Sequence, residues 1–355
     1  THNWQNCLFK HYRDFNKYVS SISWLMSNTD SCAQVLMLNP CATARSLAGG
    51  PRLSEGGEHL GINNTHPLTT QDMTAQGVVN ALMELHVPFE IVFEQVLDDA
   101  RVENGCIQIS GHAYDTLILP ATLYVTKQTN NIITEFAAQG GRLILINGIP
   151  SVDIDSMERI DIDRLLSFGN VRVIKTDEYD IVDGNKRAKA GAFMQAVRRS
   201  LEGMPRAVKT EYADGLISAF RRLGEDLILI YCNDGAGPVT VRGKVHSDRN
   251  IYVAAADTGV AKRAEIVRGG GVSAFTFELD AFETAVVLVS DEAPVMPEFS
   301  DEKYECIKLN RGMKFRPCAP NIALPQTRIV KDDAALWAAH EARDAKKLCA
   351  LAEKL

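Results

Sequence analysis

The stretch Val35-Leu36-Met37-Leu38-Asn39-Pro40 decides the fold of the first half of this 355-residue chain. Four consecutive apolar residues closed by Asn-Pro are typical of a strand that is buried on both faces of a parallel sheet, because a strand with one wet face would alternate. Similar runs follow at 89–93, 116–120 and 143–146. The sequence therefore predicts a sheet built from parallel strands.

Helical periodicity fills the segments around these strands. Apolar residues recur every three or four positions at 9–26, 78–85 and 132–137, and further helices are expected near 161–168 and 186–201. Strands that alternate with helices of this length form βαβ units with right-handed crossovers. We therefore expect a doubly wound α/β domain of the flavodoxin-like or glutamine-amidotransferase-like kind.

Two segments between the strands depart from this pattern. The segment from Cys41 to Thr70 is rich in Gly, Ser, Asn and Pro and has no period, which predicts a long loop leaving a strand end. Loops of this length usually serve a function or an interface. Asn104-Gly105 between β-capable flanks predicts a hairpin with a two-residue turn.

After about Pro205 the sequence changes to short segments rich in Val, Ile, Tyr and Phe, separated by Gly, Asp and Asn turns. Several of them alternate, as Phe275-Thr276-Phe277-Glu278-Leu279 does, which is typical of an antiparallel β-sandwich. The segments lie near 216–220, 227–231, 238–245, 250–255, 263–267, 273–279 and 284–289. We therefore expect an α/β domain over 1–205, a β-sandwich domain over 206–292, and a Pro-containing connector with a terminal helix over 293–355.

Charge and hydropathy exclude two classes of partner. The formal net charge of -7 is spread along the chain, so no basic stripe is offered to nucleic acid. The apolar runs are far shorter than the ~20 residues that a bilayer crossing needs, so no membrane span is expected. Because the chain begins with Thr1 and not with Met, we expect it to be a piece of a longer protein.

The eight cysteines show neither a C-x-x-C pair nor a histidine at metal-ligand spacing. We therefore predict no metal site, and no cofactor motif is present. Several cysteines lie beside apolar runs, where a thiol behaves as a small buried hydrophobe. Free buried thiols favour a reducing compartment, which predicts a cytoplasmic location.

A doubly wound sheet binds ligands at the carboxyl ends of its strands, so the candidate ligand-binding positions are Asn39, Thr122 and Asn147. No glycine-rich phosphate loop follows these strands. An acyl-transfer enzyme would place Cys or Ser, flanked by glycines, after the strand at 116–120, and Ala121-Thr122 stand there instead. We therefore expect Thr122 to be a loop threonine and predict no catalytic residue.

Other polar side chains have ordinary structural interpretations. Paired carboxylates are required for glycosidic hydrolysis, but the pairs in this chain are expected to cap turns and helix starts. These pairs are Asp98-Asp99, Asp153 with Asp155, Asp161 with Asp163, and Glu278 with Asp280. His112 is expected to be a hairpin or surface histidine. Arg221-Arg222 could grip an anion, although arginines on the surface of a strand are common.

Several stretches, taken in order, carry a family resemblance. They are Tyr12 to Pro40 with Trp24-Leu25-Met26-Ser27, Phe89 to Pro120 with Tyr114-Asp115-Thr116, Phe136 to Pro150 with Asn147-Gly148-Ile149-Pro150, Arg221 to Asn233, Asp257-Thr258-Gly259, and Phe282 to Leu288. Their order resembles the region beyond the catalytic barrel in large multidomain glycoside hydrolases. The likeness is to α-L-rhamnosidase-type enzymes and, more loosely, to the trimerisation domain of barrel-type β-galactosidases. The segment after Ser27 departs from the pattern because it lacks an expected glycine, and 41–70 has no counterpart.

The resemblance implies an accessory region of a glycoside hydrolase. In such enzymes the acid and base lie on an N-terminal (β/α)8 barrel, and this chain has no eight βα units. It would be non-catalytic and structural, would act in carbohydrate degradation by supporting a separate catalytic barrel or oligomerisation, and would be inactive alone. The implied partners are the barrel or identical subunits, with carbohydrate as a further candidate.

Two other functions stay open at this point. The first is a stand-alone small-molecule enzyme on the amidotransferase-like fold that uses a nucleophile near Cys41 or Thr122. A reactive Cys41 would be alkylated faster than the other thiols. The second is a carbohydrate-binding module in which the β-sandwich holds the sugar, which binding isotherms against glycans would detect.

Overall fold

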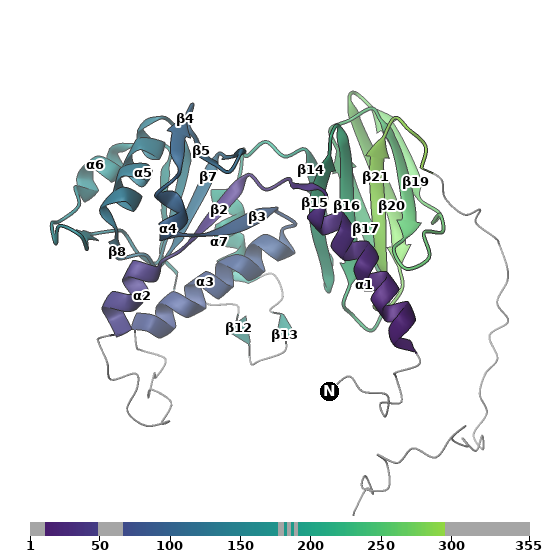
Figure 1. Cartoon of the computed structure of the whole chain (residues 1–355), viewed down its shortest axis with the longest axis horizontal. Coiled ribbons are helices and arrows are strands. Elements are labelled where there is room, and N and C mark those ends of the chain that lie inside the picture. Colours follow the sequence, from purple (N-terminus) through teal and green to yellow (C-terminus); the bar gives the residue numbers. More distant parts are fainter. Residues whose placement is uncertain (1–10, 49–66, 177–180, 183–185, 188–190, 295–355) are drawn as a thin grey trace, which may run out of the picture. The chain divides into compact units, whose positions relative to one another are not determined.

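The computed structural model describes residues 11–48, 67–176, 181–182, 186–187 and 191–294 (Figure 1). The chain divides into two compact units, Thr1–Ser21 with Asp301–Leu355, and Ile22–Ser300. The parallel and antiparallel sheets described below both lie within Ile22–Ser300. The domain boundaries expected after residues 205 and 292 stay predictions, and the terminal helix expected near the end of the chain lies outside the described residues.

Five parallel strands form the main sheet of the first half. They are β2 (Val35–Asn39), β3 (Phe89–Phe93), β7 (Thr116–Pro120), β9 (Arg142–Ile146) and β11 (Val171–Ile174). Their order is β11-β9-β7-β2-β3, and every neighbouring pair is parallel. The four strands predicted from apolar runs are confirmed, whereas β11, at one edge of the sheet, was not predicted.

Helices cover both faces of this sheet, because successive side chains of a strand point to opposite sides. Val35 and Met37 share an apolar cluster with α3 (Pro67–Glu84) and α7 (Ala192–Ser200). Leu36 and Leu38 belong to a second cluster with α5 (Lys127–Ala138) and α6 (Ile162–Ser167). Figure 1 shows α5 and α6 on the side of the sheet away from α3. Strand β2 is therefore buried on both faces.

The predicted helices are confirmed with shifted ends, and two predictions need correction. Helix α1 spans Tyr12–Ser27. The helix expected over 186–201 begins only at Ala192, because Lys186–Arg187 forms β13, paired with β12 (Ile181–Val182). The loop expected over 41–70 is wrong at both ends, since α2 (Cys41–Ala48) follows β2 and α3 begins at Pro67. Alanine and arginine favour the helix in α2, and the glycines lie beyond it. Residues 49–66 lie outside the described residues.

Short elements decorate the parallel sheet. Strands β4 (Arg101–Glu103), β5 (Cys106–Ile109) and β6 (His112–Tyr114) form an antiparallel sheet, while α4 spans Glu94–Leu97 and β8 (Tyr124–Val125) pairs with β10 (Val152–Asp153). Asn104 and Gly105 both have left-handed backbone, with φ of +53° and +73°, as a type I′ turn requires. The predicted hairpin is confirmed, and His112 is a hairpin residue that opens β6.

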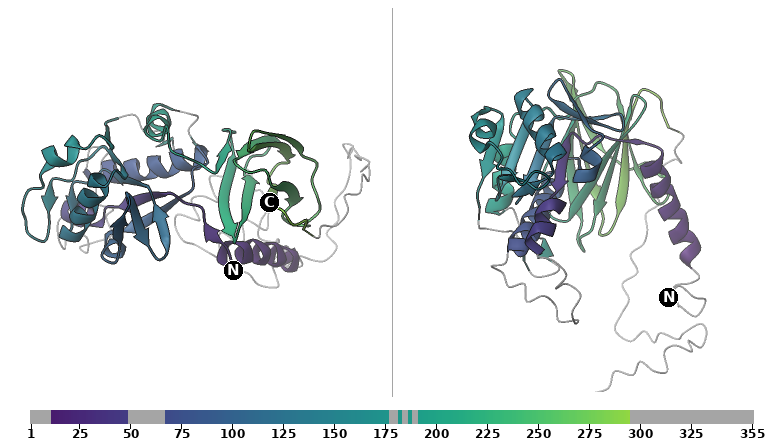
Figure 2. Two further views of the ribbon diagram at one scale, coloured as in Figure 1. Left: turned by 90° about the horizontal axis from the view of Figure 1, so that it is seen from above. Right: turned by 60° about the vertical axis from the view of Figure 1, so that its left-hand side comes forward.

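Two antiparallel sheets share one apolar core in the second half. The first contains β1 (Asp30–Ser31), β15 (Leu216–Leu223), β16 (Asp226–Asn233), β21 (Thr284–Ser290) and β18 (Asn250–Ala255), in this order. The second contains β14 (Val208–Thr210), β17 (Val239–Val245), β20 (Val272–Leu279) and β19 (Glu265–Gly269). Buried residues of both sheets belong to one cluster, and Figure 2 shows the green strands on either side of it. Each strand segment predicted after Pro205 is confirmed.

Tyr231 of β16 occupies the centre of this core. It is fully buried, and its ring makes edge-on contacts with Phe220, Phe275 and Phe277 at centroid distances of 5.9 to 6.1 Å. Its hydroxyl forms a 2.7 Å hydrogen bond with the Thr210 hydroxyl, which satisfies the one polar atom of the side chain. Burial raises the pKa of Tyr231, so the phenol stays neutral in the core.

The end of α3 is joined to β15 by His86. The helix closes with hydrogen bonds from the His86 N–H to the Met83 carbonyl and from the Val87 N–H to the Leu82 carbonyl, and His86 has a φ of +51°. This left-handed position is usually glycine. The two ring nitrogens of His86 also differ in their bonding. Nδ1 forms a 2.9 Å hydrogen bond with the Ser218 hydroxyl, while the buried Nε2 has no partner among the described residues. Burial lowers the pKa of His86 to about 4.

Gly243 of β17 lies opposite Phe275 of β20, and a Cβ atom added there would stand 2.1 Å from the Phe275 ring. We expect Gly243→Ala to lower the free energy of unfolding by about 1–3 kcal/mol, because the fully packed ring has to move. Gly237→Ala is the matched control, since nothing lies within 4 Å of its added Cβ. Urea unfolding of both variants measures the difference, and equal losses would contradict the packing described for Phe275.

The protonation of His86 predicts a loss of stability in acid. The unfolded chain takes up a proton near pH 6.5, whereas folded His86 does so only near pH 4, so acidification between these values favours the unfolded state. Neutral His86 makes its full contribution to the free energy of unfolding above pH 6.5. Up to about 3 kcal/mol of that free energy is lost as the pH falls to 4.

The test compares urea unfolding from pH 7 to pH 4 for the wild type, His86→Asn and His112→Asn. Asparagine tolerates the left-handed backbone and does not titrate, so His86→Asn should flatten part of the pH dependence. The His112→Asn control should keep the wild-type slope. An unchanged slope in His86→Asn would mean that His86 does not take part in the transition.

Candidate functional site

The carboxyl edge of the parallel sheet is the place where a ligand site is expected. The order of the strands reverses beside β2, with β3 on one side and β7 on the other. In sheets of this kind the crevice lies outside the strand ends at such a reversal. The residues to examine therefore follow Asn39 of β2, Phe93 of β3, Pro120 of β7 and Ile146 of β9.

The turn after β7 has a left-handed residue, but it carries no nucleophile. Ala121 has a φ of +41°, and its N–H donates to the Ile146 carbonyl at 2.6 Å. Thr122 is fully buried, and its hydroxyl donates to the Pro120 carbonyl at 3.2 Å. A left-handed turn after the strand was not predicted from the sequence. Because a methyl group occupies it and the hydroxyl beside it faces inward, the turn presents no atom that could attack a substrate.

Asn147, the first residue after β9, links two other segments. Its backbone is also left-handed, at a φ of +55°, and its Oδ1 accepts from the Thr176 N–H at 2.8 Å. Its Nδ2 donates to the Thr74 hydroxyl at 3.2 Å. The amide therefore connects α3 to the segment after β11. A cavity of about 570 Å³ adjoins it, lined by Thr70, Asn147, Gly148, Ile149, Val173, Lys175 and Thr176.

Asn39, the last residue of β2, is half-buried, and α2 begins two residues later at Cys41. Within α2, the Thr43 hydroxyl accepts from the N–H groups of Leu123 and Tyr124 at 3.0 and 2.9 Å and donates to the Tyr124 carbonyl at 2.9 Å. Gln71 of α3 donates to the Pro40 carbonyl at 3.0 Å. The Thr43 hydroxyl and the Gln71 amide nitrogen thus fasten α2 and the residue before it to their neighbours, whereas Oε1 of Gln71 is buried without a partner among the described residues.

Glu94 is the polar residue at this edge that was missed from the sequence. It directly follows β3 and is buried, and its Oε2 accepts from the Ala42 N–H of α2 at 2.8 Å. Oε1 is buried without a partner among the described residues. Burial raises the pKa of Glu94, the Ala42 hydrogen bond and Arg45 oppose this, and Asp155 and Asp98 add to it. The signal was available, since an acidic residue directly after a buried strand occupies a strand-end position.

The three predicted positions are thus all at the carboxyl edge, but they are not brought into one pocket. Thr122 is enclosed, Asn147 adjoins the cavity described above, and Asn39 does not line it. Carboxylates from two of the four predicted pairs accept hydrogen bonds from helix starts or turns. Asp161 accepts from the Arg164 N–H at the start of α6, Asp155 from the Lys127 N–H at the start of α5, and Asp153 from the Asp155 N–H.

Within the described ranges, no group of three or more His, Cys, Asp or Glu side chains is placed to hold a metal ion. No helix described here combines the length and the apolar character needed to cross a membrane.

No protein-family model matches this chain. No curated protein matches it either. Solved structures do, at low identity. They include a β-galactosidase from Bacillus circulans sp. alkalophilus (12% identity, TM-score 0.48), α-L-fucosidase isoenzyme 2 from Paenibacillus thiaminolyticus (14%, 0.46) and a rhamnosidase from Novosphingobium sp. PP1Y (14%, 0.44).

These similar structures are glycoside hydrolases, and all are remote. The similarity covers 80%, 79% and 62% of this chain and 45%, 51% and 21% of the three proteins in the same order. The chain therefore spans about half or less of the proteins that it matches. Identities of 12 to 14% concern the fold alone and transfer no site residue.

Removing the Thr43 hydroxyl tests whether the polar groups at the carboxyl edge stabilise the fold. We expect Thr43→Val to lower the free energy of unfolding by about 2–4 kcal/mol, because two N–H groups and one carbonyl lose their partner in a buried place. Thr43→Ser keeps the hydroxyl and removes one methyl group, so it should cost only about 1 kcal/mol. Chemical denaturation measures the free energy of unfolding of the two variants. A serine variant as unstable as the valine variant would contradict this role of the hydroxyl.

Proposed function

We propose that this chain is a non-catalytic accessory region of a glycoside hydrolase that supports a separate catalytic barrel or mediates oligomerisation. The observation that carries the proposal is the turn after β7. An enzyme on this scaffold would display its nucleophile there, and the left-handed position holds Ala121 with only a methyl group. The order of motifs along the sequence, which resembles the region beyond the barrel in such enzymes, supports the same function.

We further propose a doubly wound, flavodoxin-like or amidotransferase-like fold for the parallel sheet, and a β-sandwich for the antiparallel sheets. Numbering the five parallel strands along the chain gives the spatial order 2-1-3-4-5, which supports the first assignment. The core shared by the two antiparallel sheets supports the second.

The hydrogen bonds at the carboxyl edge suit a region that braces another. Thr43, Gln71 and Asn147 use their polar atoms to hold α2, α3 and the strand ends together. A fixed edge of this kind can support a neighbouring domain, because little of its polar capacity depends on a ligand.

Helix α1 offers a surface for the partner that this proposal requires. None of its residues is buried, and helical spacing places the exposed side chains of Phe15, Val19 and Met26 on one face, whereas exposed Trp24 lies on the opposite face. Exposed apolar side chains that gather on one face often mark a site of interaction with another protein. The catalytic barrel or an identical subunit is the partner that the family resemblance implies.

A second candidate function, a small-molecule enzyme, is favoured by one observation. The buried carboxyl of Glu94, with its raised pKa and its unpartnered oxygen, has the character of a general acid. Cys41 directly precedes Ala42, whose N–H bonds Glu94, and carries a thiol that could act as a nucleophile. Rapid alkylation of Cys41 relative to the half-buried Cys232 would favour this enzyme over the accessory region. A carbohydrate-binding module stays a prediction that glycan-binding isotherms test.

The accessory proposal predicts no glycosidase activity in the chain itself. We expect the full 355-residue chain to release no chromophore above the protein-free rate from aryl α-L-rhamnosides, α-L-fucosides or β-D-galactosides, because the proposal assigns the catalytic acid and base to a separate barrel. A glycosidase active on each substrate serves as the positive control. Turnover that disappears in Glu94→Gln would overturn the proposal and place the chemistry at the carboxyl edge.

A further inference from the structure

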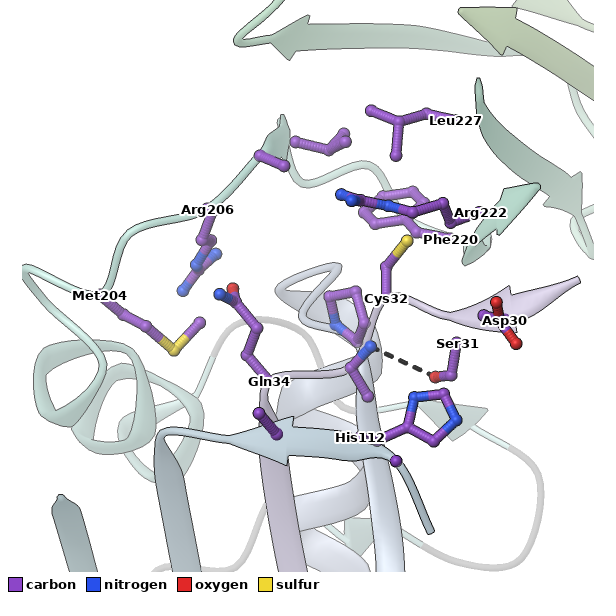
Figure 3. A pocket seen from close by; sticks show the side chains of 16 residues that line it. Asp30, Ser31, Cys32, Gln34, His112, Met204, Arg206, Phe220, Arg222 and Leu227 are labelled. Carbon is purple, nitrogen blue, oxygen red and sulfur yellow. Dashed lines mark hydrogen bonds between the residues drawn. The ribbon is translucent and has the colours of Figure 1, made fainter. Parts of the chain in front are cut away.

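A cavity of about 380 Å³ lies away from the carboxyl edge, where β1, β6, β15 and the segment before β14 come together (Figure 3). Its size falls within the roughly 300–1,000 Å³ typical of small-molecule sites. Two of its lining residues are arginines and one is acidic. The residues that bear on its chemistry are Asp30, Cys32, Gln34, Arg206, Phe220 and Arg222.

Arg221 and Arg222 are neighbours on β15, but they have different surroundings because successive side chains of a strand point to opposite faces. Arg221 donates to the Thr29 hydroxyl at 3.0 Å and to the Met26 carbonyl at 2.8 Å, and it also bonds the Thr29 carbonyl. Arg222 lines the cavity instead, and no ion pair joins it to a carboxylate of the described residues. Of the two arginines singled out from the sequence, only Arg222 is available to an anion.

The thiol beside Arg222 does not neutralise it. Cys32 lines the same cavity and forms a hydrogen bond with Arg222. Burial raises the pKa of the Cys32 thiol, Arg222 and Arg221 oppose this, and Asp30 adds to it. The net rise keeps the thiol protonated at neutral pH. Arg222 therefore faces the cavity with its charge uncompensated by Cys32.

Arg206 reaches the cavity from the segment before β14. It is half-buried, and within the described part of the chain it makes no hydrogen bond or ion pair. Burial lowers the pKa of Arg206, and the neighbouring Arg198 and Arg142 lower it further. Arg142 is already engaged, since its Nη1 donates to the Glu202 and Ser200 carbonyls. A guanidinium removed from water among other cations is costly unless an anion pairs with it.

Gln34 adds a neutral donor to the two charges. Its backbone carbonyl accepts from the Asp115 and Thr116 N–H groups, while its side-chain amide makes no hydrogen bond to the described residues. Figure 3 shows the Gln34 amide on the same side of the cavity as Arg206, with the Arg222 guanidinium extending toward that side. Asp30, the one acidic residue among those that line the cavity, stands directly opposite Arg222 in the β1–β15 ladder. The Arg222 guanidinium extends away from Asp30 toward the side of Arg206 and Gln34, where no lining residue is a carboxylate.

We propose that this cavity binds a small organic molecule through a carboxylate or phosphate group held by Arg206 and Arg222. The planar, fork-shaped guanidinium suits the oxygens of both groups. Gln34 supplies an amide donor to a third oxygen, and Phe220 and Leu227 line the cavity with apolar surface for the carbon skeleton. This site does not depend on the function proposed above, because it shares no residue with the carboxyl edge.

Calorimetric titration of the full 355-residue chain tests the site with D-galacturonate, D-glucose 6-phosphate, inorganic phosphate and the neutral sugar D-galactose. At least one of the two anionic sugars should bind, D-galactose should not, and added NaCl should weaken the binding. Binding of galacturonate identifies the carboxylate as the preferred group, and binding of glucose 6-phosphate identifies the phosphate. Binding of inorganic phosphate alone, or of neither anionic sugar at millimolar concentration, would overturn the proposal.

Three variants locate the binding. Arg206→Gln and Arg222→Gln should each weaken it by on the order of tenfold or more, because each removes a charged hydrogen-bond donor. Arg242→Gln, an exposed arginine on β17, removes the same charge elsewhere and should leave the affinity unchanged. Thermal unfolding checks that the variants fold. Arg222 is exposed and forms no ion pair within the described residues, so its variant tests the site even if Arg206→Gln is unstable. Unchanged affinity in Arg222→Gln, or an equal loss in Arg242→Gln, would show that the cavity is not the site.

Discussion

The parallel sheet of the first half depends on strands that are buried on both faces. Every apolar side chain of β7 and β9 lies in one of two cores, as does that of β2. Such strands have no side chain left for chemistry, because water reaches neither face. Helices must therefore cover both sides, and function can come only from the strand ends or from surfaces that the helices and the antiparallel sheets add. This constraint confines candidate sites of the described chain to the turns at the strand ends and to cavities at the surface.

At the strand ends, polar atoms are used mainly for cohesion. The Thr43 hydroxyl alone serves three backbone groups, and the Asn147 amide joins α3 to the segment after β11. Two side-chain oxygens at this edge, Oε1 of Gln71 and Oε1 of Glu94, are buried without a partner among the described residues, and a buried carboxyl of this kind costs stability and is seldom kept without a use. The edge thus combines the geometry of a catalytic scaffold, including the left-handed turn at Ala121, with side chains that do structural work. This combination is what an accessory region derived from such a scaffold would retain.

The sequence predicted secondary structure correctly where the pattern of apolar residues was unambiguous. Continuous apolar runs located β2, β3, β7 and β9, and alternation located the antiparallel strands, because burial on two faces or on one leaves distinct patterns. Strand β11 was missed because Val171-Arg172-Val173-Ile174 is a short edge strand with exposed positions, and α2 was missed because the glycines beyond it dominated the composition. The left-handed backbone of Ala121 could not be foreseen, because alanine does not favour it, and a histidine such as His86 adopts it too seldom for the position to be predicted from sequence. Arg222 was noticed, but its partner Arg206 is brought beside it only by the fold.

The alternation of Arg221 and Arg222 ties the charge of the cavity to the register of β15. Arg221 holds the end of α1 through Thr29 and Met26, while its neighbour faces the opposite side. A single residue inserted into β15 upstream of them would shift both, since a one-residue slip sends each side chain to the other face. Phe220 would then stand in the place of Arg221, so the helix would lose its anchor, while Arg221 would take the place of Arg222 at the cavity. Natural variation in this strand should therefore occur by substitution or by paired insertions, and length changes should be confined to the turn between β15 and β16.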